Sequence, residues 1–196
     1  VCPIGLDWLD PIKSRVGIND GFGSAFVIGE TGDAEGDYYV LLTATHVAED
    51  SRMLKLKTNE SKSRVIGEAY VVVRHSSPEP LFSEDIAVLA IQKNNVRIGK
   101  LESLSLFSDF HDIRGIISDL RFATLISGRR HAVSTGEFSV QPFLHGSVSL
   151  LNGECLPGDS GSPYIIKHGN SIYAVAMIVA GSTGSLWSRR NEGREV

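Results

Sequence analysis

The sequence predicts an all-β protein, built from many short strands joined by turns. Glycine is frequent, with 20 residues among 196, and turn residues recur between short apolar segments. Residues 53–57 read Met-Leu-Lys-Leu-Lys, an alternation typical of a strand with one buried face. Long apolar stripes at the helical period of about 3.6 residues do not occur in the sequence.

Ten segments have the composition of strands. In the first half they are residues 22–28, 38–43, 53–58, 65–74 and 86–91, and in the second half residues 121–126, 137–143, 147–151, 164–167 and 172–180. Residues 30–37 form an expected loop, and His168-Gly169-Asn170 an expected hairpin turn. Residues 7–16 would form one helical turn at most, because Pro11 interrupts them. Many short strands separated by turns indicate a sandwich or barrels.

Two domains are expected, because an apolar segment passes into a polar one between residues 101 and 115. The first domain would cover residues 1–105, including an N-terminal extension, and the second residues 106–187. Residues 188–196 are mostly polar and form an expected flexible tail. A length of 196 residues suffices to bury a substantial core.

Charge and apolar content argue against two classes of partner. The net charge of −4 disfavours a general nucleic-acid binder, which would carry a basic surface. The longest apolar run, residues 172–180, is far shorter than the roughly 20 residues of a membrane span. We therefore expect neither nucleic acid nor a membrane as a partner.

Cysteine and histidine are too sparse to indicate a disulfide framework or a metal site. Cys2 and Cys155 could form one bridge at most. His-Glu-x-x-His and Cys-x-x-Cys spacings do not occur, so we expect no metal and no other cofactor. Five histidines are interpreted as surface or hydrogen-bonded side chains: His75, His111, His131, His145 and His168.

The N-terminal residues and the cysteine content together indicate a cellular location. The N-terminal residues lack a charged segment followed by an apolar core, so no signal peptide is expected. Together with the low cysteine content, this favours an intracellular protein, either bacterial or viral in the host cytosol. The chain begins with Val1 rather than Met, so we expect a processed product, a piece of a polyprotein or a trimmed chain.

Three segments carry the residue types of nucleophilic catalysis, in the order histidine, aspartate, serine. They are residues 41–47 with His46, residues 85–89 with Asp85, and residues 158–163 with Ser160. Each alone has a structural explanation, as a histidine after a buried strand, an aspartate at a strand edge or a plain turn. Together they predict a site with Ser160 as nucleophile, because a hydroxyl needs a histidine base and a carboxylate that orients the imidazole.

The glycines beside Ser160 predict an oxyanion site as well. They allow a tight turn in which the N–H groups of Gly158 and Ser160 face one point. Such donors stabilise the negative charge that develops on a substrate carbonyl, each by about 3–4 kcal/mol in the activation barrier. Because His46 and Asp85 lie in the first half and Ser160 in the second, we expect the site in a cleft between the two domains.

These segments resemble the chymotrypsin-like (trypsin-like) serine proteases. Residues 43–46, Thr-Ala-Thr-His, resemble that family's Thr-Ala-Ala-His, and residues 85–89, Asp-Ile-Ala-Val-Leu, resemble its Asp-Ile-Ala-Leu-Leu. Residues 158–163 resemble its Gly-Asp-Ser-Gly-Gly-Pro, and residues 22–28 are similar to its strand Gly-Ser-Gly-Phe-Val-Ile. The resemblance covers roughly residues 20–185. It implies two six-stranded antiparallel Greek-key β-barrels, one in each domain, with the active site in the cleft between them.

The resemblance also implies a serine endopeptidase that acts on a polypeptide. His46 would be the base and then the acid, Asp85 its orienting residue and Ser160 the nucleophile, with Gly158 and Ser160 as oxyanion donors. Departures from the family pattern indicate a compact bacterial or viral type. Ser162 replaces the second glycine, Val47 stands where vertebrate enzymes have a bridged cysteine, and an Ile-Val-Gly-Gly start is missing.

Substrate specificity would depend on a pocket that the resemblance locates beside Glu154, Cys155, Val179 and Gly181. An acid at the place of Glu154 selects Lys or Arg in the family, and a solvated loop acid is the competing interpretation. Residues 174–180 contain no histidine, which argues against a preference for acidic substrates. A preference for small or apolar residues stays open.

Two alternatives to an active endopeptidase stay open. One is a catalytically silent binding module with the protease fold. The other is a protease that an activating partner orders, or that works within a larger polyprotein. A cysteine nucleophile at Cys155 is disfavoured, because no Gly-x-Cys-Gly sequence surrounds it.

Overall fold

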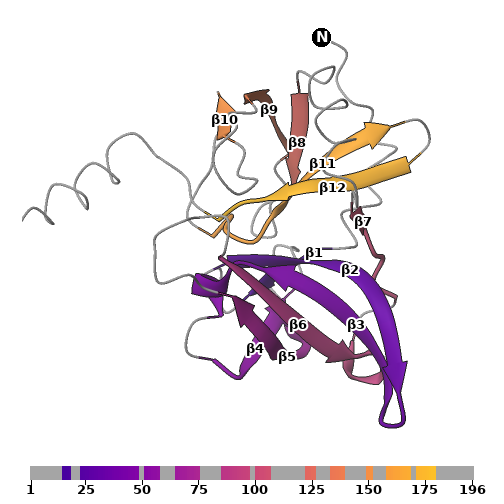
Figure 1. The fold of residues 1–196 in the computed structure, drawn as a ribbon. Coiled ribbons are helices and arrows are strands. Elements are labelled where there is room, and N and C mark those ends of the chain that lie inside the picture. The colour runs from indigo at the N-terminus through magenta and orange to yellow at the C-terminus, as the bar shows by residue number, and fades with distance from the viewer. Residues whose placement is uncertain are drawn as a thin grey trace, which may run out of the picture.

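The computed structural model describes residues 15–18, 23–48, 51–57, 65–75, 85–97, 100–106, 122–126, 133–139, 149–151, 158–168 and 171–179. Strands dominate this part of the chain, and they form two sheets that lie one above the other in Figure 1. Its helical elements are two short 3-10 helices, η4 (Thr45–Val47) and η6 (Lys93–Asn95). The predicted all-β class is therefore confirmed.

The first sheet closes into a barrel in the strand order β1-β2-β3-β6-β5-β4, and each neighbouring pair is antiparallel. Its strands are β1 (Arg15–Ile18), β2 (Gly23–Asp33), β3 (Gly36–Thr43), β4 (Met53–Lys57), β5 (Val65–His75) and β6 (Ile86–Gln92). Closure depends on β1, which pairs with both β2 and β4. The alternation predicted for β4 is confirmed, because Leu54 and Leu56 are fully buried while Met53 and Lys55 are exposed.

The expected loop at residues 30–37 is wrong. β2 continues to Asp33 and β3 begins at Gly36, so only Ala34 and Glu35 form the turn between them. The Asp33 side chain stabilises this tight turn, because its Oδ1 accepts the N–H groups of Glu35 (2.8 Å) and Gly36 (3.1 Å). Gly36 has a φ of 140°, a conformation that a residue with a side chain rarely adopts.

The helical turn considered for residues 7–16 is also wrong where the structure tests it. Residues 15 and 16 belong to β1, and residues 7–14 lie outside the described part of the chain. In β1, Arg15 and Val16 pair with Phe26 and Ala25 of β2. Pairing with a distant strand overrides a weak local preference, because the barrel needs β1 to close.

The second sheet has the strand order β10-β9-β8-β11-β12-β7. Its strands are β7 (Ser105–Leu106), β8 (Phe122–Ile126), β9 (Val133–Ser139), β10 (Ser149–Leu151), β11 (Pro163–His168) and β12 (Ser171–Met177). Its pairs are antiparallel except β12 with β7, which is parallel. β9 begins four residues earlier than the segment expected at 137–143, because residues 133–137 pair with β8. As described, this sheet is open, with β10 at one edge and β7 at the other. A second closed barrel therefore stays a prediction.

A buried apolar cluster joins the two sheets. Phe26 of β2 packs with Ile165 of β11, Ala174 of β12 and Leu104, which precedes β7. A backbone hydrogen bond accompanies this packing: Leu104 N–H, just before β7, donates to Val27 O of β2 over 2.8 Å. The predicted boundary between residues 105 and 106 falls inside β7, and it stays a prediction.

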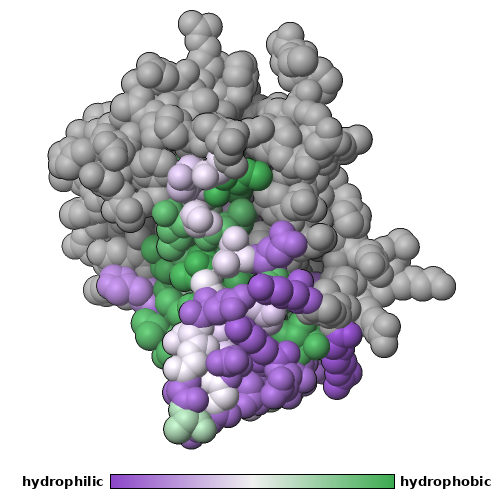
Figure 2. Space-filling model, turned by 90° about the vertical axis from the view of Figure 1, so that its right-hand side faces the viewer, coloured by the Kyte–Doolittle hydropathy of each residue, from purple (hydrophilic) through white to green (hydrophobic). Residues whose placement is uncertain are grey.

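One end of the β2–β3 hairpin points away from this cluster. In the view of Figure 2, hydrophilic residues gather over the lower part of the molecule, and a hydrophobic area lies above them, towards the second sheet. The burial of β2 follows the same gradient, because its first five residues are buried and its last four are exposed. The start of β2 therefore lies towards the second sheet, and its end at the hairpin points to solvent.

Candidate active site

His46 lies in η4, immediately after β3, and three contacts hold this segment. The Thr45 hydroxyl donates to the His75 carbonyl at the end of β5 (2.8 Å). Arg74 donates to the carbonyls of Ala48 (3.1 Å, from Nε) and Ser51 (from Nη2), which follow η4. These bonds satisfy carbonyl groups at strand and helix ends, and they tie the histidine segment to β5.

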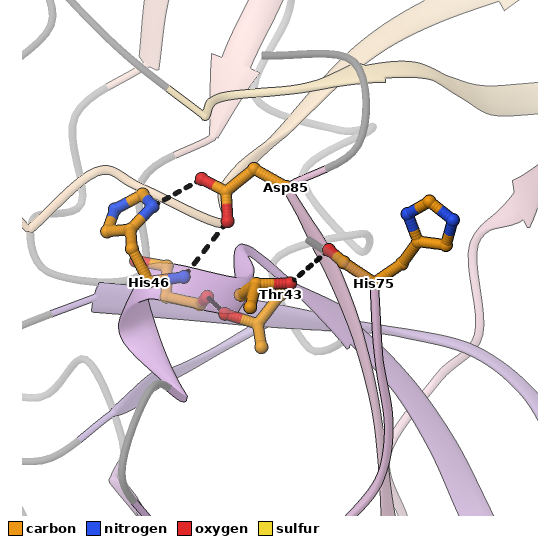
Figure 3. Close-up of polar contacts among 6 residues, drawn as sticks. Thr43, His46, His75 and Asp85 are labelled. Carbon is orange, nitrogen blue, oxygen red and sulfur yellow. Dashed lines mark hydrogen bonds and ion pairs between the residues drawn. The ribbon is translucent and has the colours of Figure 1, made fainter. Parts of the chain in front are cut away.

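The pairing of β3 with β6 brings His46 to Asp85. Thr43 pairs with Ala87, so the residue two positions after Thr43 meets the residue two positions before Ala87. Accordingly, Thr45 N–H donates to Asp85 O over 3.3 Å. Asp85 Oδ1 accepts the backbone N–H of His46 (2.9 Å), and Asp85 Oδ2 lies 2.5 Å from His46 Nδ1 (Figure 3). One carboxylate thus contacts both the backbone and the ring of one histidine.

Two opposing effects act on the carboxyl group of Asp85. Partial burial raises its pKa, but the side-chain and backbone hydrogen bonds from His46 outweigh that effect and lower the pKa below its usual value. Asp85 is therefore ionised at neutral pH. An ionised acceptor at Nδ1 requires that nitrogen to carry the proton, which leaves Nε2 as the acceptor of the neutral ring. His75, at the end of β5, directs its ring away from this pair in Figure 3.

Ser160 lies in a tight turn before β11. Gly158 has a φ of 95° and Gly161 a φ of 84°, so the two glycines adopt conformations unfavourable for other residues. Ser162 N–H donates to Asp159 O (2.8 Å) and closes the turn. Gly161 N–H donates to Ile178 O (2.7 Å), and Ile178 N–H donates to Ser162 O (2.9 Å). The turn is therefore anchored to the chain that follows β12.

The same turn is attached to the first barrel through Ser24, the second residue of β2. Ser24 N–H donates to Ser160 O (2.8 Å), and the Ser24 hydroxyl donates to Gly158 O (3.0 Å). The Thr43 hydroxyl donates to Ser24 O (2.8 Å). A Cβ at Gly161 would overlap both that carbonyl oxygen and the Thr43 hydroxyl. The close approach of two backbones thus requires glycine at position 161.

Gly23 links the two parts of the site. A Cβ on Gly23 would overlap the Val47 side chain, so Val47 lies directly against the start of β2. Gly23 therefore packs beside the residue after His46, while the next residue, Ser24, bonds to the Ser160 turn. Two consecutive residues of β2 thus contact the two segments of the site: Gly23 the histidine segment and Ser24 the Ser160 turn.

The sequence-predicted residues fall into three groups. His46 and Asp85 are in direct contact. Ser160 lies in the turn attached to the same end of the barrel, although within the described contacts no hydrogen bond joins it to His46. The third group is the predicted specificity pocket: Val179 packs against the core of the first barrel, and Glu154, Cys155 and Gly181 lie outside the described residues. Their roles stay predictions, as do those of Gly158 and Ser160 as oxyanion donors.

The sequence interpretation did not assign a role to Ser24, Thr43 or Arg74. Ser24 and Thr43 stand in the segments that resemble protease motifs, but a serine or threonine at a strand end has many local uses. Their contacts span residues far apart in the chain, with 134 positions between Ser24 and Gly158. The packing of the two sheets creates the contact of Ser24 with Gly158, whereas those of Thr43 and Arg74 form within the first barrel.

The residues that the structure describes contain no group of three or more His, Cys, Asp or Glu side chains placed to hold a metal ion. The helices of this part of the chain are too short to cross a membrane.

Several solved structures share this fold. The NSP4 proteinase from Equine Arteritis Virus aligns with a TM-score of 0.52 and 17% sequence identity, over 88% of this chain and 69% of that protein. The chain is structurally similar to chymotrypsin-like proteases over most of its length. The HtrA-type protease AlgW, solved with a decapeptide, aligns with a TM-score of 0.47 and 18% identity, over 83% of this chain and 45% of that protein.

Sequence comparison adds no closer relationship. No family model matches the chain, and no curated protein sequence matches it. At 17% identity, the alignment with the viral proteinase establishes the fold alone.

Proposed function

We propose that this protein is a serine endopeptidase that hydrolyses peptide bonds through an acyl-enzyme. The main observation in support of this proposal is the contact of Asp85 with both the backbone N–H and the Nδ1 of His46. Such a carboxylate selects the tautomer in which Nε2 is free to take a proton, which is the requirement for a histidine base. The proposal includes a second closed barrel, so that the site lies in a cleft between two six-stranded barrels.

In the proposed reaction, Ser160 Oγ attacks the carbonyl carbon of the scissile peptide while His46 Nε2 takes the hydroxyl proton. The N–H groups of Gly158 and Ser160 donate to the oxyanion, and Asp85 stabilises the imidazolium. His46 then protonates the leaving amine, the C–N bond breaks, and an ester of Ser160 remains. Water, deprotonated by His46, hydrolyses that ester and restores the serine hydroxyl.

The substrate in this proposal is a polypeptide, and the reaction needs no metal or cofactor. The Glu154, Cys155, Val179 and Gly181 region is the proposed pocket for the residue before the scissile bond. An acid at Glu154 would favour Lys or Arg there, because a buried carboxylate needs a cationic partner. An intracellular location also belongs to this proposal.

A second function is a silent or partner-activated binding module of the same fold. It is favoured by the missing hydrogen bond between His46 and Ser160 among the described contacts. Unliganded proteases often have a long histidine–serine distance that shortens when substrate binds, so this geometry suits an active enzyme as well.

Labelling with a fluorophosphonate separates the two functions. We expect the parent chain to be labelled and Ser160→Ala to remain unlabelled. His46→Ala should lower the labelling rate by roughly 10³-fold or more, because the hydroxyl loses its base. Ser171→Ala, which removes an exposed hydroxyl at the start of β12, is the matched control and should be labelled at the parental rate. A parent chain that resists the reagent would favour the binding module, and a labelled Ser160→Ala would exclude Ser160 as the nucleophile.

A further inference from the structure

Ser24 is fully buried where the first barrel meets the Ser160 turn, and its backbone and side chain both contact that turn. Its N–H group donates to Ser160 O, and its hydroxyl donates to Gly158 O. Any residue except proline could provide the first bond at this position, since it uses the backbone N–H. The second bond depends on the serine hydroxyl, so position 24 has a side-chain role that can be tested separately.

These two bonds act on the peptide groups around the Ser160 N–H. In a planar trans peptide the C=O and the N–H point in opposite directions, so fixing a carbonyl also fixes the next N–H. The carbonyls of Gly158 and Ser160 are held by Ser24, and the carbonyl of Asp159 by Ser162 N–H. All three peptide groups from Gly158 to Gly161 therefore have a bonded carbonyl.

The orientation of this turn is costly to maintain without such bonds. Gly158 and Gly161 both have positive φ, and glycine can reach many other conformations at little cost. The bond from Ser24 Oγ restrains rotation of the peptide between Gly158 and Asp159. An oxyanion site requires N–H groups that are already in place before the reaction, because reorienting them would add to the barrier.

We propose that Ser24 is a positioning residue. Its hydroxyl and its N–H hold the carbonyls of Gly158 and Ser160, which belong to the peptides on either side of the one that carries the Ser160 N–H, and so hold the turn in which the N–H groups of Gly158 and Ser160 face the oxyanion. This inference rests on the proposed function. It makes the first barrel, which carries the histidine and aspartate, responsible for the shape of the oxyanion site in the second sheet. Thr43 supports Ser24 in turn, because its hydroxyl donates to Ser24 O.

The first test measures kcat and KM for hydrolysis of p-nitrophenyl acetate, a small ester that does not depend on the specificity pocket. We expect Ser24→Ala to lower kcat by roughly 10- to 100-fold, somewhat less than the loss of a direct oxyanion donor. KM should stay within about twofold, since the oxyanion forms only in the transition state. Ile66→Val is the control: it truncates a buried core residue at the opposite end of β5 from His75. Its kcat should stay within about twofold of the parent.

The second test measures amide hydrogen exchange by mass spectrometry and needs no activity. Ser24→Ala should speed exchange in the segment at residues 158–162 and leave residues 65–75 unchanged. If Ser24→Ala is not obtained folded, Thr43→Val removes the hydroxyl that supports Ser24 and should shift both readouts in the same direction, by less. A Ser24→Ala chain with parental kcat and parental exchange would overturn the role of Ser24. A different result would overturn the proposed function instead: Ser24→Ala exchanges faster, but the parent chain neither hydrolyses the ester nor reacts with fluorophosphonate.

Discussion

Asp85 binds His46 at two points, with Oδ1 on the backbone N–H (2.9 Å) and Oδ2 on Nδ1 (2.5 Å). The first contact holds the segment that carries the histidine, and the second holds its ring. The side chains remain partly accessible, with relative exposures of 43% for His46 and 23% for Asp85. The His46 ring is thus held at Nδ1 and remains partly exposed, which suits a group that exchanges protons with a bound molecule.

Replacement of Asp85 by asparagine should reduce activity while retaining the fold. The amide can still accept the backbone N–H of His46 through Oδ1, but it cannot stabilise an imidazolium cation. We expect kcat for p-nitrophenyl acetate to fall by roughly 10³- to 10⁴-fold, the scale found when this carboxylate is neutralised in serine proteases. The circular dichroism spectrum should match that of the parent. An Asp85→Asn chain with near-parental kcat would exclude Asp85 as the orienting residue.

The Asp85 carboxylate should also stabilise the folded protein in a pH-dependent way. Its pKa is lower in the folded chain, so its contribution is complete above the unfolded value of about 4 and is lost as the pH falls through the folded value. We expect the difference in free energy of unfolding between the parent and Asp85→Asn to be present at pH 5 and to shrink below about pH 4. Urea unfolding at a series of pH values measures it. An equal difference at pH 3 and pH 5 would contradict the lowered pKa.

Gly161→Ala should destabilise the protein and distort the Ser160 turn. The new methyl group would overlap the Ser24 carbonyl and the Thr43 hydroxyl, and φ is 84° at this position. We expect a loss of at least about 1–3 kcal/mol in the free energy of unfolding, measured with urea. Gly29→Ala is the matched control, since a Cβ at Gly29 meets no atom within 4 Å, and its stability should be unchanged or slightly higher. Equal effects at the two glycines would contradict the close packing at Gly161.

The contact between Gly23 and Val47 predicts a compensating pair of substitutions. Gly23→Ala alone should lower stability and the rate of fluorophosphonate labelling, because the added methyl pushes on the residue next to His46. Val47→Ala removes the atoms that the methyl would overlap. The double variant should therefore recover part of the loss, with a coupling free energy of about 0.5–3 kcal/mol in a double-mutant cycle. Strictly additive losses would mean that the two residues do not constrain each other.

The strands were predictable where the sequence carried a clear period. Apolar alternation indicated β4, and compact apolar segments indicated β3 and β6. The hairpin at residues 30–37 was predicted wrongly, because Gly32 and Gly36 look the same in a loop and in a tight turn. Strand β1 was missed, because its four residues are too few to show a period. The start of β9 was displaced for a related reason, since Val133 to Ser139 contains no strong apolar pattern before Glu137.

The sequence by itself determined the strand-rich class and the three segments with residue types suited to nucleophilic catalysis. Period, glycine content and motif are local properties, and they can be read from neighbouring residues. The sequence led us to expect Asp85 beside His46, but the tertiary structure alone decided which atoms make that contact and that Ser24 reaches Gly158 and Ser160. Those contacts arise from the register of β3 with β6 and from the packing of two sheets, and neither leaves a trace in the local sequence. Hydrogen bonds over 39 and 134 positions form only after the intervening chain has folded.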